Sequence, residues 1–229
     1  MKEIFDSPLF GIMISILAFE IGLLINRRTR IAIFNPLLIS IILIIAFLQV
    51  FNVSLDSFNK GGDIISFFLA PATVILAVPL FKQFELLKTN LIPIIVGITI
   101  GCITALTSIY LFSRLFGLDA ALTASLIPKS VTTPIGIEVS KQIGGVPSIT
   151  VAAIIITGII GAVIGPMICR IFGIKDKVAI GISIGTSSHA LGTTKAIELG
   201  ETEGAMSGLA IGVAGLITVF LAPLFIKFL

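Results

Sequence analysis

The sequence predicts an all-α integral membrane protein, with about six transmembrane helices plus two re-entrant hairpins, or with eight helices of which two are broken. Of its 229 residues, 56% are hydrophobic and 12% are charged, and the mean hydropathy is +1.18. Apolar runs of about 20 residues, the length that crosses about 30 Å of hydrocarbon, recur along almost the whole chain. Because these runs leave no room for a soluble domain, residues 1–229 are expected to form a single membrane domain in a lipid bilayer.

Six continuous spans follow from the uninterrupted apolar runs. They are expected at about Pro8–Ile25, Ile31–Phe51, Ile64–Phe81, Leu91–Ser113, Pro147–Cys169 and Ala205–Phe228. The polar stretches Asn52–Asp63 and Lys82–Asn90 are expected to be water-exposed loops. The first span is not expected to be a cleaved signal peptide, because the basic cluster from Arg27 to Arg30 follows it instead of preceding it.

Composition also bears on the classes of function. A net charge of +3 in such a chain is expected to record cytoplasmic Lys and Arg, so no nucleic-acid partner is predicted. Cys102 and Cys169 lack metal-ligand spacing, and neither a metal nor another cofactor is expected. The usual catalytic motifs are missing, so no enzyme is predicted. A Ser-Lys dyad at Lys129 and a regulator or pore former that acts by assembly stay open as alternatives.

Two polar runs interrupt the apolar second half of the chain. They are Ser125-Leu-Ile-Pro-Lys-Ser-Val-Thr-Thr-Pro134 and Gly185-Thr-Ser-Ser-His-Ala-Leu-Gly-Thr-Thr194, and they contain the only histidine of the protein. Polar residues are expensive inside a membrane. These runs are therefore the expected place for function.

An internal repeat relates the two polar runs. Arg114-Leu-Phe-Gly117 recurs 56 residues later as Arg170-Ile-Phe-Gly173, and Gly136 and Gly144 match Gly192 and Gly200 at the same offset. Residues 114–169 and 170–229 are therefore interpreted as two copies of one unit, a polar-centred segment followed by a continuous helix. Residues 1–113 would form a scaffold of helices.

Each polar-centred segment could cross the membrane as a broken helix or return to its own side as a re-entrant hairpin. With Lys129 left out, two crossings divide the Lys and Arg residues seven to seven between the two sides, whereas two hairpins give nine to five. The positive-inside rule favours the hairpins. The two copies would then be inverted, and their polar tips would meet near the midplane from opposite faces, as in an inverted-repeat transporter.

Glycines at small-xxx-small spacing mark the same half of the chain. Examples are Gly97-x3-Gly101 and Gly161-x3-Gly165. Small faces let helices approach closely, so these pairs are interpreted mainly as packing within one bundle, with a gliding or dimer surface as the alternative.

A buried lysine needs a negative partner, and a small carboxylate would meet that need at Lys129. The alternative is that Lys129 reaches water at an interface. His189 could carry a coupled proton or could be a hydrogen-bonded structural residue, and a coupling proton or Na⁺ is the one co-factor left open. The residues expected to bind the substrate are Lys129, Ser130, Thr132, Thr133, Ser187, Ser188, His189, Thr193 and Thr194.

Over essentially its full length the chain resembles the LrgB/CidB family of bacterial membrane proteins. The resemblance is carried by Ile127-Pro-Lys-Ser-Val-Thr-Thr-Pro-Ile-Gly136, by Gly185-Thr-Ser-Ser-His-Ala-Leu-Gly-Thr-Thr-Lys-Ala196 and by the Glu201-Thr-Glu-Gly-Ala-Met-Ser-Gly208 turn. It implies a multi-pass protein of the bacterial inner (cell) membrane that works with a smaller LrgA/CidA-type holin-like partner. Members are described as antiholin-like or holin-like factors that modulate murein hydrolase activity and autolysis.

The resemblance also implies a substrate class. A plastid relative looks like a glycolate/glycerate translocator, and some bacterial pairs are implicated in pyruvate uptake. A passive pore has no need for two hydroxyl-rich breaks around one lysine, whereas a carrier of small carboxylates does. The predicted function is therefore transport of small carboxylates, linked to control of autolysis, with antiholin-like action by assembly as the alternative. A homodimer is expected by analogy with other inverted-repeat carriers.

Overall fold

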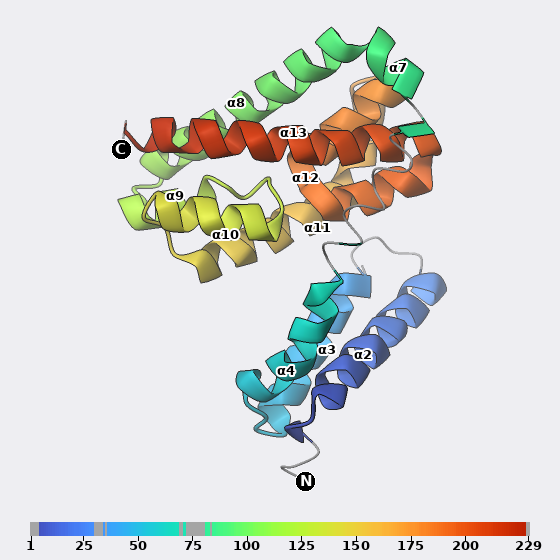
Figure 1. The fold of residues 1–229 in the computed structure, drawn as a ribbon, viewed down its shortest axis with the longest axis vertical. Helices are drawn as coiled ribbons and strands as arrows, with labels where there is room; N and C mark the ends of the chain where they lie inside the picture. Colours follow the sequence, from blue (N-terminus) through green and yellow to red (C-terminus); the bar gives the residue numbers. More distant parts are fainter. Residues whose placement is uncertain are drawn as a thin grey trace. The chain divides into compact units, whose positions relative to one another are not determined.

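The fold was obtained as a computed structural model, which describes residues 5–29, 34, 36–68, 71, 81–82 and 84–227. Every regular element in this part of the chain is an α-helix (Figure 1). The chain divides into two compact units, residues 1–75 and 76–229. The functional division expected at residue 113, between a scaffold and two repeat units, stays a prediction.

Four helices are long and apolar enough to cross a membrane: α2 (Pro8–Thr29), α8 (Leu91–Leu115), α11 (Pro147–Ile171) and α13 (Glu201–Ile226). They confirm a helical, multi-pass membrane protein and lie close to the predicted spans. A fifth apolar helix, α3 (Pro36–Val50), is shorter. Most of the span expected at Ile64–Phe81 lies outside the described residues.

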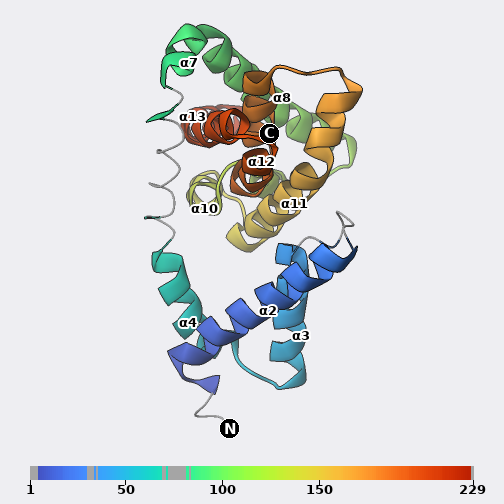
Figure 2. The same cartoon turned by 90° about the vertical axis from the view of Figure 1, so that its right-hand side faces the viewer.

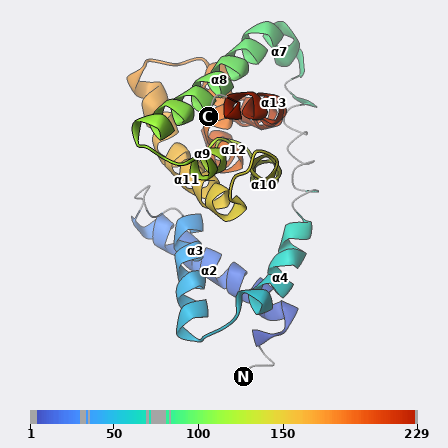
Figure 3. The same cartoon turned by 90° about the vertical axis from the view of Figure 1, so that its left-hand side faces the viewer.

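In the first unit, α2 packs against both α3 and α4, and two of its glycines lie at these contacts (Figure 3). A Cβ atom at Gly22 would lie 2.5 Å from the Pro36 carbonyl oxygen at the start of α3, and one at Gly11 would lie 3.0 Å from the Cα of Gly61. The backbones therefore touch, and only glycine fits at these contacts.

The stretch Asn52–Asp63, expected to be a loop, is largely helical, because α4 runs Leu55–Phe67. Ser54 caps this helix by accepting a hydrogen bond from the Ser57 backbone N–H, 3.2 Å away. Lys60 pairs with Asp6 at 2.6 Å, and hydrogen bonds from Lys60 and Ser57 lower the pKa of the Asp6 carboxyl group. The stretch is polar because one face of helix α4 is exposed, not because the chain forms a loop there.

Two further expectations of non-helical structure are wrong. The link Lys82–Asn90 contains the short helix α7 (Phe84–Thr89), whose Leu87 packs against the α8 and α13 core. Residues 201–208, expected to be a turn, are the opening turns of α13. In both cases an apolar contact of the tertiary structure stabilises a helix that the local polarity hides.

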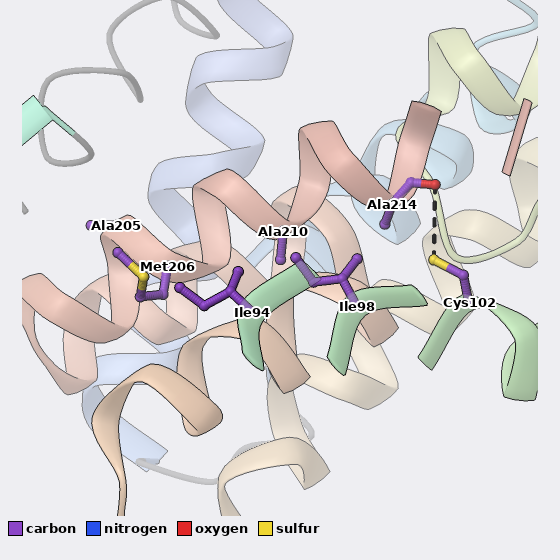
Figure 4. Close-up of a cluster of buried hydrophobic side chains, with 7 residues drawn as sticks. All are labelled: Ile94, Ile98, Cys102, Ala205, Met206, Ala210 and Ala214. Carbon is purple, nitrogen blue, oxygen red and sulfur yellow. Dashed lines mark hydrogen bonds between the residues drawn. The ribbon is translucent and has the colours of Figure 1, made fainter. Parts of the chain in front are cut away.

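In the second unit, α8 and α13 run in the same direction and share one apolar core. Figure 4 shows Ile94 and Ile98 of α8 between side chains of α13, and Cys102 Sγ lies 3.9 Å from the Ala214 carbonyl oxygen. Further along, Leu106 and Ile109 of α8 cluster with Ala222 near the end of α13. These two helices frame the elements that form the site.

The contact between Gly11 and Gly61 makes a specific prediction about stability. Gly61→Ala places a methyl group 2.7 Å from the Gly11 Cα and should destabilise the protein by about 1–3 kcal/mol, the usual cost of overpacking. Gly62→Ala is the matched control, because the nearest atom to its new methyl is 3.7 Å away. Thermal unfolding of the detergent-purified variants measures both. Equal unfolding temperatures for the two variants would contradict the close packing of α2 on α4.

Candidate functional site

The first polar run lies at the tip of a helical hairpin. Helix α9 (Ala120–Leu126) and helix α10 (Thr133–Gln142) are joined by residues 127–132, and the chain doubles back there. The Ser125 hydroxyl accepts a hydrogen bond from the Val146 N–H at 2.7 Å, and a Cβ at Gly136 would lie 3.5 Å from the Pro128 carbonyl oxygen. Pro128 helps to end the first arm, since a proline restricts the residue before it and lacks an N–H.

The second polar run also doubles back, although its helix α12 (Lys177–Leu199) is nearly continuous in the chain. His189 has φ 42° and ψ −138°, which breaks α12 into a first arm, residues 177–188, and a second arm, residues 190–199. A Cβ at Gly192 would lie 3.0 Å from the Ile184 carbonyl oxygen, eight residues earlier. A straight helix would separate these positions by about 12 Å. The two arms therefore lie side by side.

Helix α11 holds both hairpins along one face. Thr150 Oγ1 lies 2.8 Å from the Ser125 carbonyl oxygen of the first hairpin. Ile154, one turn on, offers its backbone oxygen to His189 Nε2 at 2.9 Å. A Cβ at Gly158 would lie 2.7 Å from the imidazole of His189, and one at Gly161 would collide with the Ser188 hydroxyl. Gly158 and Gly161 therefore leave the space that the tip of the second hairpin occupies.

The hairpins approach from opposite ends of the long helices. Ile127 and Val139 of the first hairpin pack in the cluster formed by the C-terminal halves of α8 and α13. Val178 and Ile182 of the second hairpin pack against the N-terminal halves of the same two helices. Figure 2 views α13 nearly end-on and shows α12 and α10 beside it. The 56-residue repeat and its inversion in the membrane stay predictions.

An open cleft of about 420 Å³ lies between α8, the first hairpin tip and the first arm of α12. Lys129 and Ser130 line it from the first tip, and Thr186 and Ser187 from the first arm. The other lining residues are Gly97, Gly101, Thr104, Ala105, Ile182 and Ser183. The cleft is thus mostly lined by hydroxyls, small residues and one lysine.

Lys129 is the cation of this cleft, and it is half-buried. Its ammonium group donates to Ser130 Oγ at 3.3 Å, a neutral partner. By contrast, a carboxylate pairs with each of Lys60, Lys82, Lys88, Lys141 and Lys195. Among the residues that the structure describes, no carboxylate forms an ion pair with Lys129. A charge in this position attracts an anion.

Thr186 also lines the cleft, but its hydroxyl oxygen is buried. The residue is only 7% exposed, and this oxygen has no hydrogen-bond partner. Since a buried hydroxyl without a partner is costly, the group would gain from a ligand that reached it. A cation without a carboxylate and a residue with an unpartnered hydroxyl therefore line one cleft.

The nine residues expected to bind substrate divide into three groups. Lys129, Ser130 and Ser187 line the cleft. Three are buried with partners in the protein: Ser188, His189 and Thr193. Three lie outside the cleft lining: Thr132, Thr133 and Thr194. The binding role of each stays a prediction, but the first group alone touches the cleft.

The sequence reasoning missed the α8 wall and part of the first arm. The sequence predicts Gly97 and Gly101 to be packing residues, yet a Cβ at Gly101 would lie 3.0 Å from the Thr186 methyl group, so this pair also bounds the cleft. Thr186 stands within the second polar run, and its place on the same arm as Ser187 was the available signal. In the described part of the chain, no group of three His, Cys, Asp or Glu residues is placed to hold a metal ion.

Comparisons with known proteins agree on one family. The model of the LrgB-like family matches residues 15–228. The chain is 38% identical over 224 residues to proteins named antiholin-like protein LrgB from Bacillus mycoides (strain KBAB4), Bacillus cereus (strain B4264) and Bacillus anthracis (strain CDC 684 / NRRL 3495). Each match covers 97% of this chain and 97% of the relative. No solved structure matches with statistical significance.

The contact between the second hairpin and α11 predicts that two substitutions compensate for each other. Gly158→Ala should destabilise the protein by about 1–3 kcal/mol, because the new methyl would lie 2.7 Å from the His189 ring. His189→Gly in the same chain should restore much of this loss, since it empties that space and relieves the positive φ. Thermal unfolding of the wild-type protein, the two single variants and the double variant measures how strongly the two substitutions are coupled.

Gly212→Ala on α13 is the control, because no atom lies within 4 Å of its new methyl group. Strictly additive effects of Gly158→Ala and His189→Gly would contradict the direct contact between the two residues.

Proposed function

The chain belongs to the LrgB-like family, and we propose that it binds a small carboxylate in the cleft at Lys129 and carries this anion across the membrane. The single observation that carries the proposal is the position of Lys129, in a cleft where the described residues give it no carboxylate partner. Lysine in apolar surroundings is stable only when its charge is compensated. A monocarboxylate would supply the missing negative charge.

The hydroxyls around Lys129 favour a carboxylate over a bare halide ion. The Thr186 hydroxyl has no partner, and Ser130 and Ser187 line the same cleft. A hydroxy or keto acid presents several oxygen atoms that such groups can bond, in addition to its charge. A small carboxylate therefore fits this lining, and the family resemblance implies pyruvate, glycolate and glycerate as the acids to test.

The hairpin tips offer additional positive potential. Helix α10 begins at Thr133, directly after the first tip, and its N-cap Thr132 makes no side-chain capping bond. The second arm of α12 likewise begins at its tip, after His189. Helix N-termini present free N–H groups and the positive end of the helix dipole, which favour an anion.

Two hairpins that approach one cleft from opposite ends suit alternating access. Movement of either hairpin against α8 and α13 would open the cleft toward its own side. In this proposal the repeats 114–169 and 170–229 are inverted, and both hairpins re-enter the bilayer without crossing it.

A second candidate function is antiholin-like regulation by assembly, and the names of the relatives favour it. Those relatives are named antiholin-like proteins, and no name among them mentions transport. Regulation of murein hydrolases would then follow from association with an LrgA/CidA-type holin-like protein in the bacterial inner membrane, with a homodimer as the expected assembly. The transport proposal rests on the cleft alone, and the two functions are compatible if transport changes the gradients that control lysis.

Uptake by reconstituted liposomes tests the carrier directly. Wild-type protein should take up labelled pyruvate, glycolate or glycerate. Lys129→Ala should lower the uptake rate by about tenfold or more, because a hydrogen bond to a charged group is worth about 1.5–3 kcal/mol. Thr186→Val, which removes only the hydroxyl, should raise KM by about two- to tenfold.

The matched control for that assay is Lys141→Ala, which removes an exposed lysine paired with Glu138 on the same hairpin and should leave uptake unchanged. If liposomes that contain the wild-type protein take up none of the three acids, the carrier proposal is wrong. Graded leakage of unrelated solutes, insensitive to Lys129, would instead support a pore.

Labelling of single cysteines tests the re-entrant hairpins. Phe116→Cys and Lys141→Cys flank the first hairpin, and Lys175→Cys and Glu198→Cys flank the second, all at exposed positions. If both segments re-enter, an impermeant thiol reagent should label the first pair from one side of the membrane and the second pair from the other. Labelling of the two members of a pair from opposite sides would show that the segment crosses.

A further inference from the structure

A second, much smaller cavity adjoins the cleft. Its volume is about 10 Å³, which is room for one water-sized group. Ala105, Ser130 and Thr186 line both spaces, so the cavity lies directly beside the cleft. The other lining residues come from α8, from α13 and from the first hairpin tip: Cys102, Leu106, Ala214, Thr218 and Ile127.

This cavity is mostly apolar, unlike the cleft. None of its lining residues is charged, and Cys102, Leu106 and Ile127 belong to the two buried apolar clusters of the second unit. Figure 4 shows Cys102 of α8 and Ala214 of α13 facing each other between the two helices. A methyl group suits such a lining, whereas a hydroxyl group there would have to find a hydrogen-bond partner. The cavity therefore favours the apolar end of a small ligand.

One small acid can reach both Lys129 and this cavity. The Lys129 ammonium group donates to Ser130 Oγ at 3.3 Å, and Ser130 lines the cavity. In a three-carbon acid such as pyruvate, the methyl carbon is only two bonds away from the carboxyl carbon. A carboxylate held by Lys129 in the cleft therefore brings the terminal carbon of the acid to the wall that cleft and cavity share.

We propose that this cavity is the specificity pocket of the cleft, and that it selects three-carbon monocarboxylates with a terminal methyl group. With the carboxylate at Lys129, the cavity takes the methyl group of pyruvate. A two-carbon acid such as glycolate leaves the cavity empty, and glycerate brings a hydroxyl group into an apolar space. A four-carbon acid is too long by one methylene group. The inference rests on the proposed function, because it concerns the anion bound at Lys129.

Substitutions at Cys102 change the size of the cavity in both directions. In reconstituted liposomes, wild-type protein should prefer pyruvate to α-ketobutyrate, its homologue with one more methylene group, by about tenfold or more in kcat/KM. Cys102→Ala removes the sulfur atom from the wall and should lower this preference by about tenfold, because the extra methylene group then fits. Cys102→Met fills the cavity and should lower kcat/KM for pyruvate relative to glycolate by about tenfold.

The matched controls are Cys169→Ala and Cys169→Met. Cys169 is also a buried cysteine of a long apolar helix, but it lines neither the cleft nor the cavity. Both control variants should keep the wild-type order of the acids. Unchanged preferences in the two Cys102 variants would overturn the proposal, and so would the same changes in the Cys169 variants.

Equilibrium binding separates the pocket from transport. Detergent-purified wild-type protein should bind labelled pyruvate, and unlabelled pyruvate should compete better than glycolate, glycerate or α-ketobutyrate. If the protein binds the acids in this order but liposomes take up none of them, the proposed function fails and the specificity pocket stands. If the purified protein does not bind pyruvate, or if glycerate competes better than pyruvate, the pocket is refuted.

Discussion

The close approach of both hairpins to one face of α11 is the contact on which the rest of the second unit depends. Four residues of α11 at about one-turn spacing contact first one hairpin and then the other: Thr150, Ile154, Gly158 and Gly161. Because Gly158 and Gly161 have no side chains, His189 and Ser188 can lie directly on the helix. This fixes both tips within reach of the same cleft.

The hydroxyl groups of the polar runs do two different kinds of work. Breaking a helix in apolar surroundings leaves backbone groups that need partners. Thr150 supplies such a partner at the first break by donating to the Ser125 carbonyl oxygen, and Thr193, which donates to the His189 carbonyl oxygen at 3.0 Å, does so at the second. The Ser125 hydroxyl serves the Val146 N–H at the start of α11. Ser130, Thr186 and Ser187 instead line the cleft. Only the second kind is available to a ligand.

This distinction explains which part of the site was predictable. Lys129 and Ser187 were identified from composition, because a lysine and clustered hydroxyls stand out in an apolar chain. Composition does not distinguish a polar side chain that bonds a backbone atom of the protein from one that faces a cleft. His189 and Thr193 were therefore predicted as substrate-binding residues together with Lys129 and Ser187. Gly97 and Gly101 were recognised only as a packing motif, because a glycine carries no chemical sign of the space beside it. The helix α4 was missed because its exposed polar face resembles a loop.

By itself, the sequence determined the membrane class, the long apolar helices, the two interrupted segments and the family, since length, hydropathy and motifs are properties of the chain alone. Only the tertiary structure decided that each interrupted segment doubles back, that α11 seats both, and that Lys129 shares a cleft with Thr186. It also placed Glu203 in a buried position, where Gly181 of α12 closely approaches the Glu203 backbone. The physical reason is that burial and missing partners arise from contacts between residues far apart in the chain, which no local pattern records.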